Sequence, residues 1–106
     1  MRGKLALILG TAALATPAVH AQQAEALRTA SLAATCAACH GTEGRAVREA
    51  AIPGLAGMPA LYLREQMLAF QRGTRPGSVM PQLAKGYSEA QIDGLAAYFA
   101  QRPAAR

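Results

Sequence analysis

The residues best suited to chemistry in this chain of 106 amino acids are two cysteines and a histidine. Cys36 and Cys39 are the only cysteines, two alanines separate them, and His40 follows directly. A disulfide at this spacing closes too small a loop to constrain the unfolded chain much. A thioredoxin-like redox pair needs an α/β domain, and no alternating strand pattern is present. Zinc requires a fourth ligand, and the other histidine, His20, lies in a segment that we expect to be removed.

The remaining interpretation is covalent attachment of a c-type haem, for which Cys-x-x-Cys-His is the recognised pattern. Two intervening residues let one helical turn present the thiols of Cys36 and Cys39 to the two vinyl groups. The adjacent imidazole of His40 is then directed at the iron as a metal ligand. The motif therefore predicts one haem c, and a thiol oxidoreductase stays open as an alternative only if no haem is bound.

Three methionines beyond Ala21 compete for the second axial position on the iron. Met80 is the preferred metal ligand, because the segment around it is expected to be a loop that can fold back over the haem. Met67 lies on the apolar face of a predicted helix and suits core packing, while Met58 is an alternative haem contact. A thioether ligand would saturate the iron and raise its reduction potential, which favours electron transfer over substrate binding.

The segment from Met1 to Ala21 has the pattern of a cleaved secretory signal peptide. Arg2 and Lys4 precede an apolar run from Leu5 to Ala15, and small residues lead up to Ala21. The run is shorter than the roughly 20 residues that a membrane-spanning helix needs. We therefore expect residues 1–21 to be removed on export to the periplasm, leaving residues 22–106 as a single domain with no membrane span.

The composition of the chain after Ala21 limits both partners and core size. Without Arg2 and Lys4, Lys plus Arg falls from 11 to 9 against 6 acidic residues, so the net charge falls from +5 to +3. The basic residues form no cluster and few aromatics lie between them, so nucleic acid is not an expected partner. Large apolar residues are few after Ala21, since alanine dominates the hydrophobic content and tryptophan is absent. A core this small usually needs a disulfide, metal or cofactor.

Helical spacing of apolar residues predicts an all-α fold with three helices and no strands. The first helix is expected from about residue 24 to 35, with Leu27, Ala30 and Ala34 on one face. The second is expected between Pro59 and Gly73, and the third between Ser88 and about Arg102. Ser88 and Gln91 have the spacing of a capping box. Residues 42–57 and 73–86 are expected to be irregular. The buried faces of the last two helices are predicted to contain Leu63, Met67 and Phe70, and Ile92, Leu95, Ala96 and Phe99.

The motifs, taken in order, resemble the small class I c-type cytochromes of the bacterial periplasm. The resemblance rests on the residues 36–40, 52–57 and 80–81 and on the closing amphipathic helix, and it covers nearly all of the chain after Ala21. It implies a class I cytochrome c fold, in which three main helices and loops surround one covalently attached haem. It also implies that the carbonyl of Pro53 accepts a hydrogen bond from the ring of His40, and that Leu55 packs on the haem.

Residues 52–67 and 86–88 are also similar to two subgroups of that family. One comprises high-potential cytochromes with two tandem domains, and the other is the haem subunit of flavocytochrome c sulfide dehydrogenase. This likeness implies electron transfer to or from redox proteins, a flavoprotein subunit among the candidates, by a chain that is not catalytic by itself. The alternatives are a freely diffusing single-haem carrier and a haem protein that binds ligands at an open sixth site.

Overall fold

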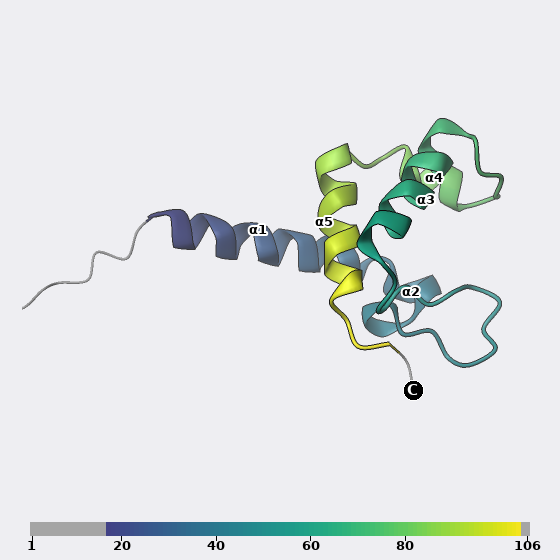
Figure 1. The fold of residues 1–106 in the computed structure, drawn as a ribbon, viewed down its shortest axis with the longest axis horizontal. Helices are drawn as coiled ribbons and strands as arrows, with labels where there is room; N and C mark the ends of the chain where they lie inside the picture. The colour runs from purple at the N-terminus through teal and green to yellow at the C-terminus, as the bar shows by residue number, and fades with distance from the viewer. Residues whose placement is uncertain (1–16, 105–106) are drawn as a thin grey trace, which may run out of the picture.

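The computed structural model describes residues 17–104, and these form five α-helices, one 3-10 helix and no strands. The expected all-α fold is therefore confirmed, with short helices in addition to the three expected ones (Figure 1). The elements are α1 (Pro17–Ala34), α2 (Ala37–His40), the 3-10 helix η1 (Thr42–Gly44), α3 (Ala60–Arg72), α4 (Met80–Ala84) and α5 (Glu89–Ala100).

The two best-defined helix ends are those that the sequence predicted. At the start of α5, the backbone N–H of Gln91 donates to Ser88 Oγ at 3.2 Å, and that of Ser88 donates to Gln91 Oε1 at 2.9 Å. This reciprocal pair is the expected capping box, and it satisfies two donors that the helix itself cannot. The helix α3 stops where Gly73 adopts a left-handed conformation.

The core lies where α5 is covered by α1 on one side and by α3 on the other (Figure 1). The four residues predicted for the inner face of α5 are all buried, and Leu63 joins them from α3. Met67 and Phe70, predicted to be buried with it, are half-buried, and Leu68 is buried instead. The resulting cluster is compact but small, consisting of Ala33, Leu63, Leu95, Ala96 and Phe99.

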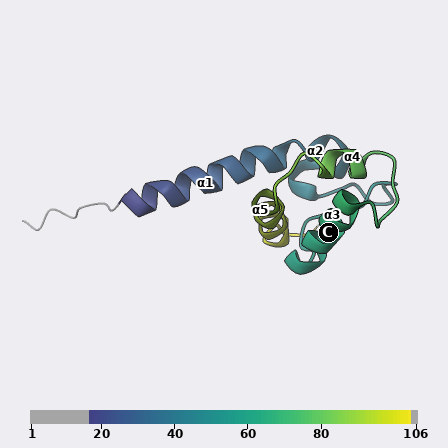
Figure 2. The ribbon, with the colours of Figure 1, turned by 90° about the horizontal axis from the view of Figure 1, so that it is seen from above.

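The face with Leu27, Ala30 and Ala34 is not the one that α1 buries, although Ala30 is half-buried. Leu27 is 69% exposed and Ala34 is also exposed, whereas Ala33 is the one buried residue of α1. Thr29 and Ala33 lie one turn apart on the side that faces α5. In an alanine-rich helix the faces differ little in hydrophobicity, so the sequence pattern does not indicate which face is buried. α1 also begins earlier in the chain than expected, and its first half extends away from the other helices in both views (Figures 1 and 2).

The segment between α3 and α5 is also more regular than predicted. Residues 80–84 form α4, although residues 73–86 were expected to be irregular throughout. Pro81 stands at the second position of this helix, where the missing N–H of proline removes no intrahelical hydrogen bond. Proline usually breaks a helix when it lies in the interior, but at this position Pro81 favours the start of α4. The 3-10 helix η1 is a further short element in the predicted loop of residues 42–57.

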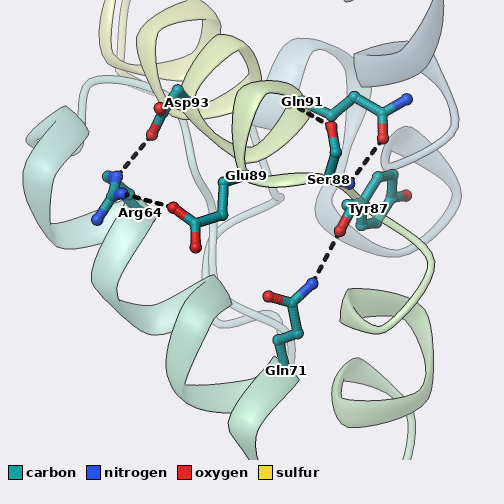
Figure 3. A network of polar contacts seen from close by, with 7 residues as sticks. All are labelled: Arg64, Gln71, Tyr87, Ser88, Glu89, Gln91 and Asp93. Atoms are coloured by element: carbon teal, nitrogen blue, oxygen red, sulfur yellow. Dashed lines mark hydrogen bonds and ion pairs between the residues drawn. The ribbon is translucent and has the colours of Figure 1, made fainter.

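An exposed polar contact joins α3 to the first turns of α5 (Figure 3). Arg64 Nε donates to Asp93 Oδ1 at 2.6 Å, and Arg64 Nη2 donates to Glu89 Oε2 at 3.3 Å. The two carboxylates also lie near the positive end of the α5 dipole. Because both carboxylates are exposed and Arg64 is only partly buried, the contact contributes no more than about 1 kcal/mol to stability.

The crossing of α1 and α5 depends on the small size of Gly94. A Cβ atom at this position would lie 3.2 Å from Thr29 Oγ1 and 3.5 Å from Thr29 Cγ2. We expect Gly94→Leu to lower the free energy of unfolding by about 1–3 kcal/mol, because the added side chain forces the two helices apart. Denaturant titration measures this change. Thr29→Ala in the same background is expected to restore part of the loss, and additive effects of the two substitutions would contradict the close approach.

The predicted signal segment is covered only in part. Residues 17–21 form the beginning of α1, and residues 1–16 of the signal prediction lie outside the described residues. Within residues 17–104, none of the helices combines the length and the apolar character that crossing a membrane requires. Removal of residues 1–21 remains a prediction.

Candidate haem-binding site

Cys36, Cys39 and His40 lie on a single helical turn. Cys36 is the N-cap residue of α2, Cys39 belongs to the helix, and His40 is its last residue. The backbone N–H of His40 donates to the carbonyl oxygen of Cys36 at 2.9 Å, which closes the turn. Both thiols are free, with Cys39 exposed and Cys36 half-buried. This is the arrangement that attachment of two thiols to one planar group requires.

The pKa of the Cys36 thiol differs from that expected of a redox-active cysteine pair. Burial raises the pKa of the Cys36 thiol, a hydrogen bond with Thr35 opposes this shift, and the neighbouring Cys39 thiol adds to it. Reactive cysteines usually have a lowered pKa, since the thiolate is the nucleophile. In addition, residues 17–104 contain no strand to supply the α/β context of a thioredoxin-like motif. The thiol oxidoreductase alternative therefore finds no support in the structure.

The ring of His40 is buried and oriented by the backbone. Its Nδ1 lies 2.7 Å from the carbonyl oxygen of Pro53, and the residue is only 9% exposed. Because a carbonyl oxygen only accepts hydrogen bonds, Nδ1 carries the proton and donates. In a neutral ring with its proton on Nδ1, the other nitrogen, Nε2, carries the lone pair, which is the form of imidazole that binds a metal.

The segment carrying Pro53 is held against the turn that follows His40. The carbonyl oxygen of Gly44, the last residue of η1, accepts the N–H groups of Leu55 at 2.8 Å and Ala56 at 3.1 Å. These two bonds fix the chain just beyond Pro53, so its carbonyl stays directed at His40. Leu55 itself is half-buried and packs against the core cluster. Its contact with haem remains a prediction.

Met80 comes from a separate part of the fold. It is the first residue of α4 and is half-buried, and α4 packs against α3. In Figure 1, α2 and α4 lie apart, at different ends of α3. The structure thus brings four of the six predicted site residues together around α2, while Leu55 packs on the core beside them and Met80 lies on its own helix. Met58 contacts the core cluster, and Met67 is half-buried on α3.

The donor set fits a haem better than a bare metal ion. Within residues 17–104, no three His, Cys, Asp or Glu side chains are placed to hold a metal, so the two thiols and the imidazole do not converge as zinc would require. Exposed apolar side chains include Ile52, which precedes Pro53, Val79, which precedes Met80, and Leu83, which lies with Met80 on α4. Exposed apolar groups of this kind suit the edge of a flat, apolar cofactor.

Gly41, directly after His40, occupies a conformation that only glycine tolerates. Its φ is +84° and its ψ is 160°, and a Cβ atom there would lie 2.3 Å from the carbonyl oxygen of Arg45. We expect Gly41→Ala to destabilise the protein by about 2–5 kcal/mol, as strain and overlap combine. Gly73→Ala is the matched control, since Gly73 also has a positive φ but no atom within 4 Å of an added Cβ. Its expected cost is about 1–2 kcal/mol. Equal losses in denaturant unfolding would contradict the overlap at Gly41.

Nothing in the sequence marks Gln71 as a special residue. It lies near the end of α3, and its side-chain amide donates to two backbone carbonyls, one at the end of α4 and one between α4 and α5. No pattern of residue types predicts a hydrogen bond from a side chain to a distant backbone, because any polar residue can make one. Only the packing of α3 against α4 brings these groups within reach.

The chain is similar in sequence to several known electron-transfer proteins. The chain is 44% identical over 69 residues to a thiosulfate dehydrogenase electron acceptor of Thiomonas intermedia, a match covering 65% of this chain and 32% of the relative. It is 37% identical over 68 residues to the cytochrome subunit of sulfide dehydrogenase of Chlorobaculum tepidum, covering 64% and 60% of the two chains. It is also 37% identical over 71 residues to cytochrome c-554(548) of Halomonas halodenitrificans, covering 64% and 84%.

The matched regions span about a third of the first of these relatives and three fifths of the second. A family model also matches residues 22–99, which include α2, α3, α4 and most of α5. The expected resemblance to c-type cytochromes is thereby confirmed. Because this match extends over well more than half of its length, the chain belongs to the cytochrome c family described as cytochrome C oxidase, cbb3-type, subunit III.

Proposed function

We propose that this chain is an exported electron carrier of the periplasm with one haem c. Cys36 and Cys39 would attach the haem covalently, and His40 and Met80 would be the two axial ligands of its iron. Pro53 would orient His40, and Leu55 would contact the haem. Residues 1–21 would be removed on export, which leaves residues 22–106 as the functional domain.

Membership of the cytochrome c family implies haem c as the cofactor and electron transfer as the role. When bound, the haem supplies a one-electron couple at its iron. The protein sets the properties of that couple through the groups it places around it. His40 donates its Nδ1 proton to a fixed carbonyl, which makes the ring a better ligand and prevents it from rotating. A thioether from Met80 would favour the reduced state and exclude external ligands.

The observation that carries the proposal is the hydrogen bond of 2.7 Å from His40 Nδ1 to the carbonyl oxygen of Pro53. This hydrogen bond selects the tautomer that a metal-binding histidine needs. His40 also lies on the same helical turn as two free thiols. A purely structural role of His40 in the core would not explain the two free thiols of Cys36 and Cys39 beside it. The exposed apolar residues Ile52, Val79 and Leu83 add support, since a bound haem would give them a partner.

For the partner, we propose a sulfur-oxidising dehydrogenase, with a flavoprotein subunit as the first candidate. Two of the similar proteins are named for such a role, one as the electron acceptor of thiosulfate dehydrogenase and one as the cytochrome subunit of sulfide dehydrogenase. In this arrangement the chain does not itself transform the sulfur compound. A freely diffusing carrier is the second candidate, and the match that covers 84% of cytochrome c-554(548) indicates that a domain of this size can make up most of a c-type cytochrome.

The experiment that tests the proposal is an absorption spectrum of the protein purified from its own host without denaturant. Haem bands that persist after acid extraction indicate covalent attachment, and their absence would contradict the proposal. Flavin that co-purifies with the haem would support a subunit of a flavoprotein dehydrogenase. Haem in a small species without flavin would instead favour the diffusing carrier.

A further inference from the structure

The turn between α4 and α5 is attached to α3 by one side-chain amide. Gln71 is half-buried in the last turn of α3, and its Nε2 donates to the carbonyl oxygen of Ala84 at 3.0 Å and to that of Tyr87 at 2.8 Å. Figure 3 shows Gln71 reaching from α3 to Tyr87, next to the capping box of Ser88. Both N–H groups of the amide are therefore used by the turn.

The two acceptors differ in what else they bind. The carbonyl of Ala84 also accepts the N–H of Tyr87 at 3.2 Å, so it keeps one partner without Gln71. The carbonyl of Tyr87 immediately precedes the N-cap residue Ser88, outside the hydrogen-bonded part of α5. Among the described residues, Gln71 is the only one that donates a hydrogen bond to the carbonyl of Tyr87. Loss of the amide thus leaves a part-buried acceptor without its partner.

α4 depends on such contacts for its position. It has only five residues, and so short a helix is not stable by itself in water. Ala84, at its end, is completely buried, and Met80 begins the same turn. The two residues are four positions apart, or about 6 Å along the helix axis. A group that holds the backbone at Ala84 therefore also determines where Met80 lies.

We propose that Gln71 is a positioning residue for Met80, holding α4 against α3 so that the thioether stays on the iron. The proposal rests on the ligand role of Met80 in the proposed function. Gln71 acts at the far end of the turn from the ligand, through hydrogen bonds to the carbonyls of Ala84 and Tyr87. Its loss is expected to increase the fraction of molecules in which Met80 has left the iron, without affecting attachment of the haem.

The test compares Gln71→Leu with Arg64→Met in the full chain carrying its haem. Leu keeps the approximate volume of Gln71 but cannot donate. Arg64→Met removes the two polar contacts that Arg64 makes with α5 and leaves the hydrogen bonds of Gln71 in place. The readouts are the rate of cyanide binding, the sulfur-to-iron absorption band, and hydrogen exchange of the backbone amides in α4 and α5.

We expect Gln71→Leu to bind cyanide about tenfold faster than the wild type, since an unsatisfied acceptor shifts the opening equilibrium by roughly that factor. Amide exchange of Ala84 and Gly86 should rise in parallel, while that of Leu95 stays unchanged. Arg64→Met should alter neither. If Gln71→Leu does not fold, Gln71→Asn, which is shorter by one methylene group, is expected to show the same changes.

Three results would overturn the proposal, and the first two separate it from the proposed function. A wild type with the sulfur-to-iron band, and unchanged cyanide binding in the Gln71 variants, would remove the positioning role and leave the proposed function intact. A wild type that lacks this band would remove the ligand role of Met80, and the positioning role with it. Equal acceleration in Arg64→Met would also contradict the proposal, because it would indicate general destabilisation.

Discussion

Replacement of both Cys36 and Cys39 by alanine is expected to abolish covalent haem and most of the fold. Within residues 17–104, only eight apolar residues are buried, and three of them are alanines. Ile92 is the one large side chain that is completely buried. So small a core does not offset the conformational entropy of the chain unless a cofactor adds apolar contacts. Far-UV circular dichroism at room temperature should therefore show loss of most of the helical signal in the double variant.

Ala38→Ser is the matched control for the double cysteine variant. Ala38 is an exposed residue between the two cysteines, so its substitution changes α2 but leaves both thiols in place. We expect this variant to carry covalent haem and to unfold at nearly the wild-type denaturant concentration. A double cysteine variant that is folded and free of haem would show that the apolar core suffices, and would refute the argument from core size.

Replacement of Met80 by alanine is expected to leave the haem attached and to open its sixth position. Cyanide and carbon monoxide should then bind without first displacing a thioether. If the open form makes up a tenth or less of the wild type, the apparent affinity for cyanide rises about tenfold or more. The reduction potential should fall as well, because a thioether ligand raises it. Absorption spectroscopy and a redox titration measure both effects.

Met58→Ala and Met67→Ala separate this prediction from a general loss of packing. Met58 packs against the core cluster and Met67 is half-buried on α3, so both substitutions remove apolar contacts of similar size. They are expected to lower stability and to retain the sulfur-to-iron band. Retention of that band in Met80→Ala, or its loss in either control alone, would assign the ligand to a different methionine.

Elements with a strong local signal were predictable from the sequence. The capping box at Ser88 and the spacing of Ile92, Leu95 and Phe99 define the start and inner face of α5, since both signals depend on residues within a few positions. Gly73 marks the end of α3 in the same way. The thiols and the imidazole of the 36–40 motif were evident for an equally local reason, because one helical turn contains them all.

Features that depend on tertiary contacts were not predictable. The inner face of α1 contains Ala33 rather than Leu27, because the position of α5, and not hydrophobicity, selects it. α4 is too short to form without α3 beside it, and Pro81 made a loop the natural expectation there. The contact of Gln71 with two carbonyls depends on the same packing. Local sequence propensity does not determine the buried face of α1, the formation of α4 or the hydrogen bonds of Gln71.

The exposed first half of α1 has a consequence for processing of the chain. From residue 17 to residue 28, every residue is exposed except Ala24, which is half-buried, whereas Thr29 lies against Gly94 of α5. A peptidase needs a locally unwound substrate, and a helical segment without buried contacts unwinds at little free-energy cost. Cleavage after Ala21 would therefore cut a part of the helix that makes no buried contacts, and Ala33 would keep its packing against α5. Maturation and folding would in this sense be independent, and they could occur in either order.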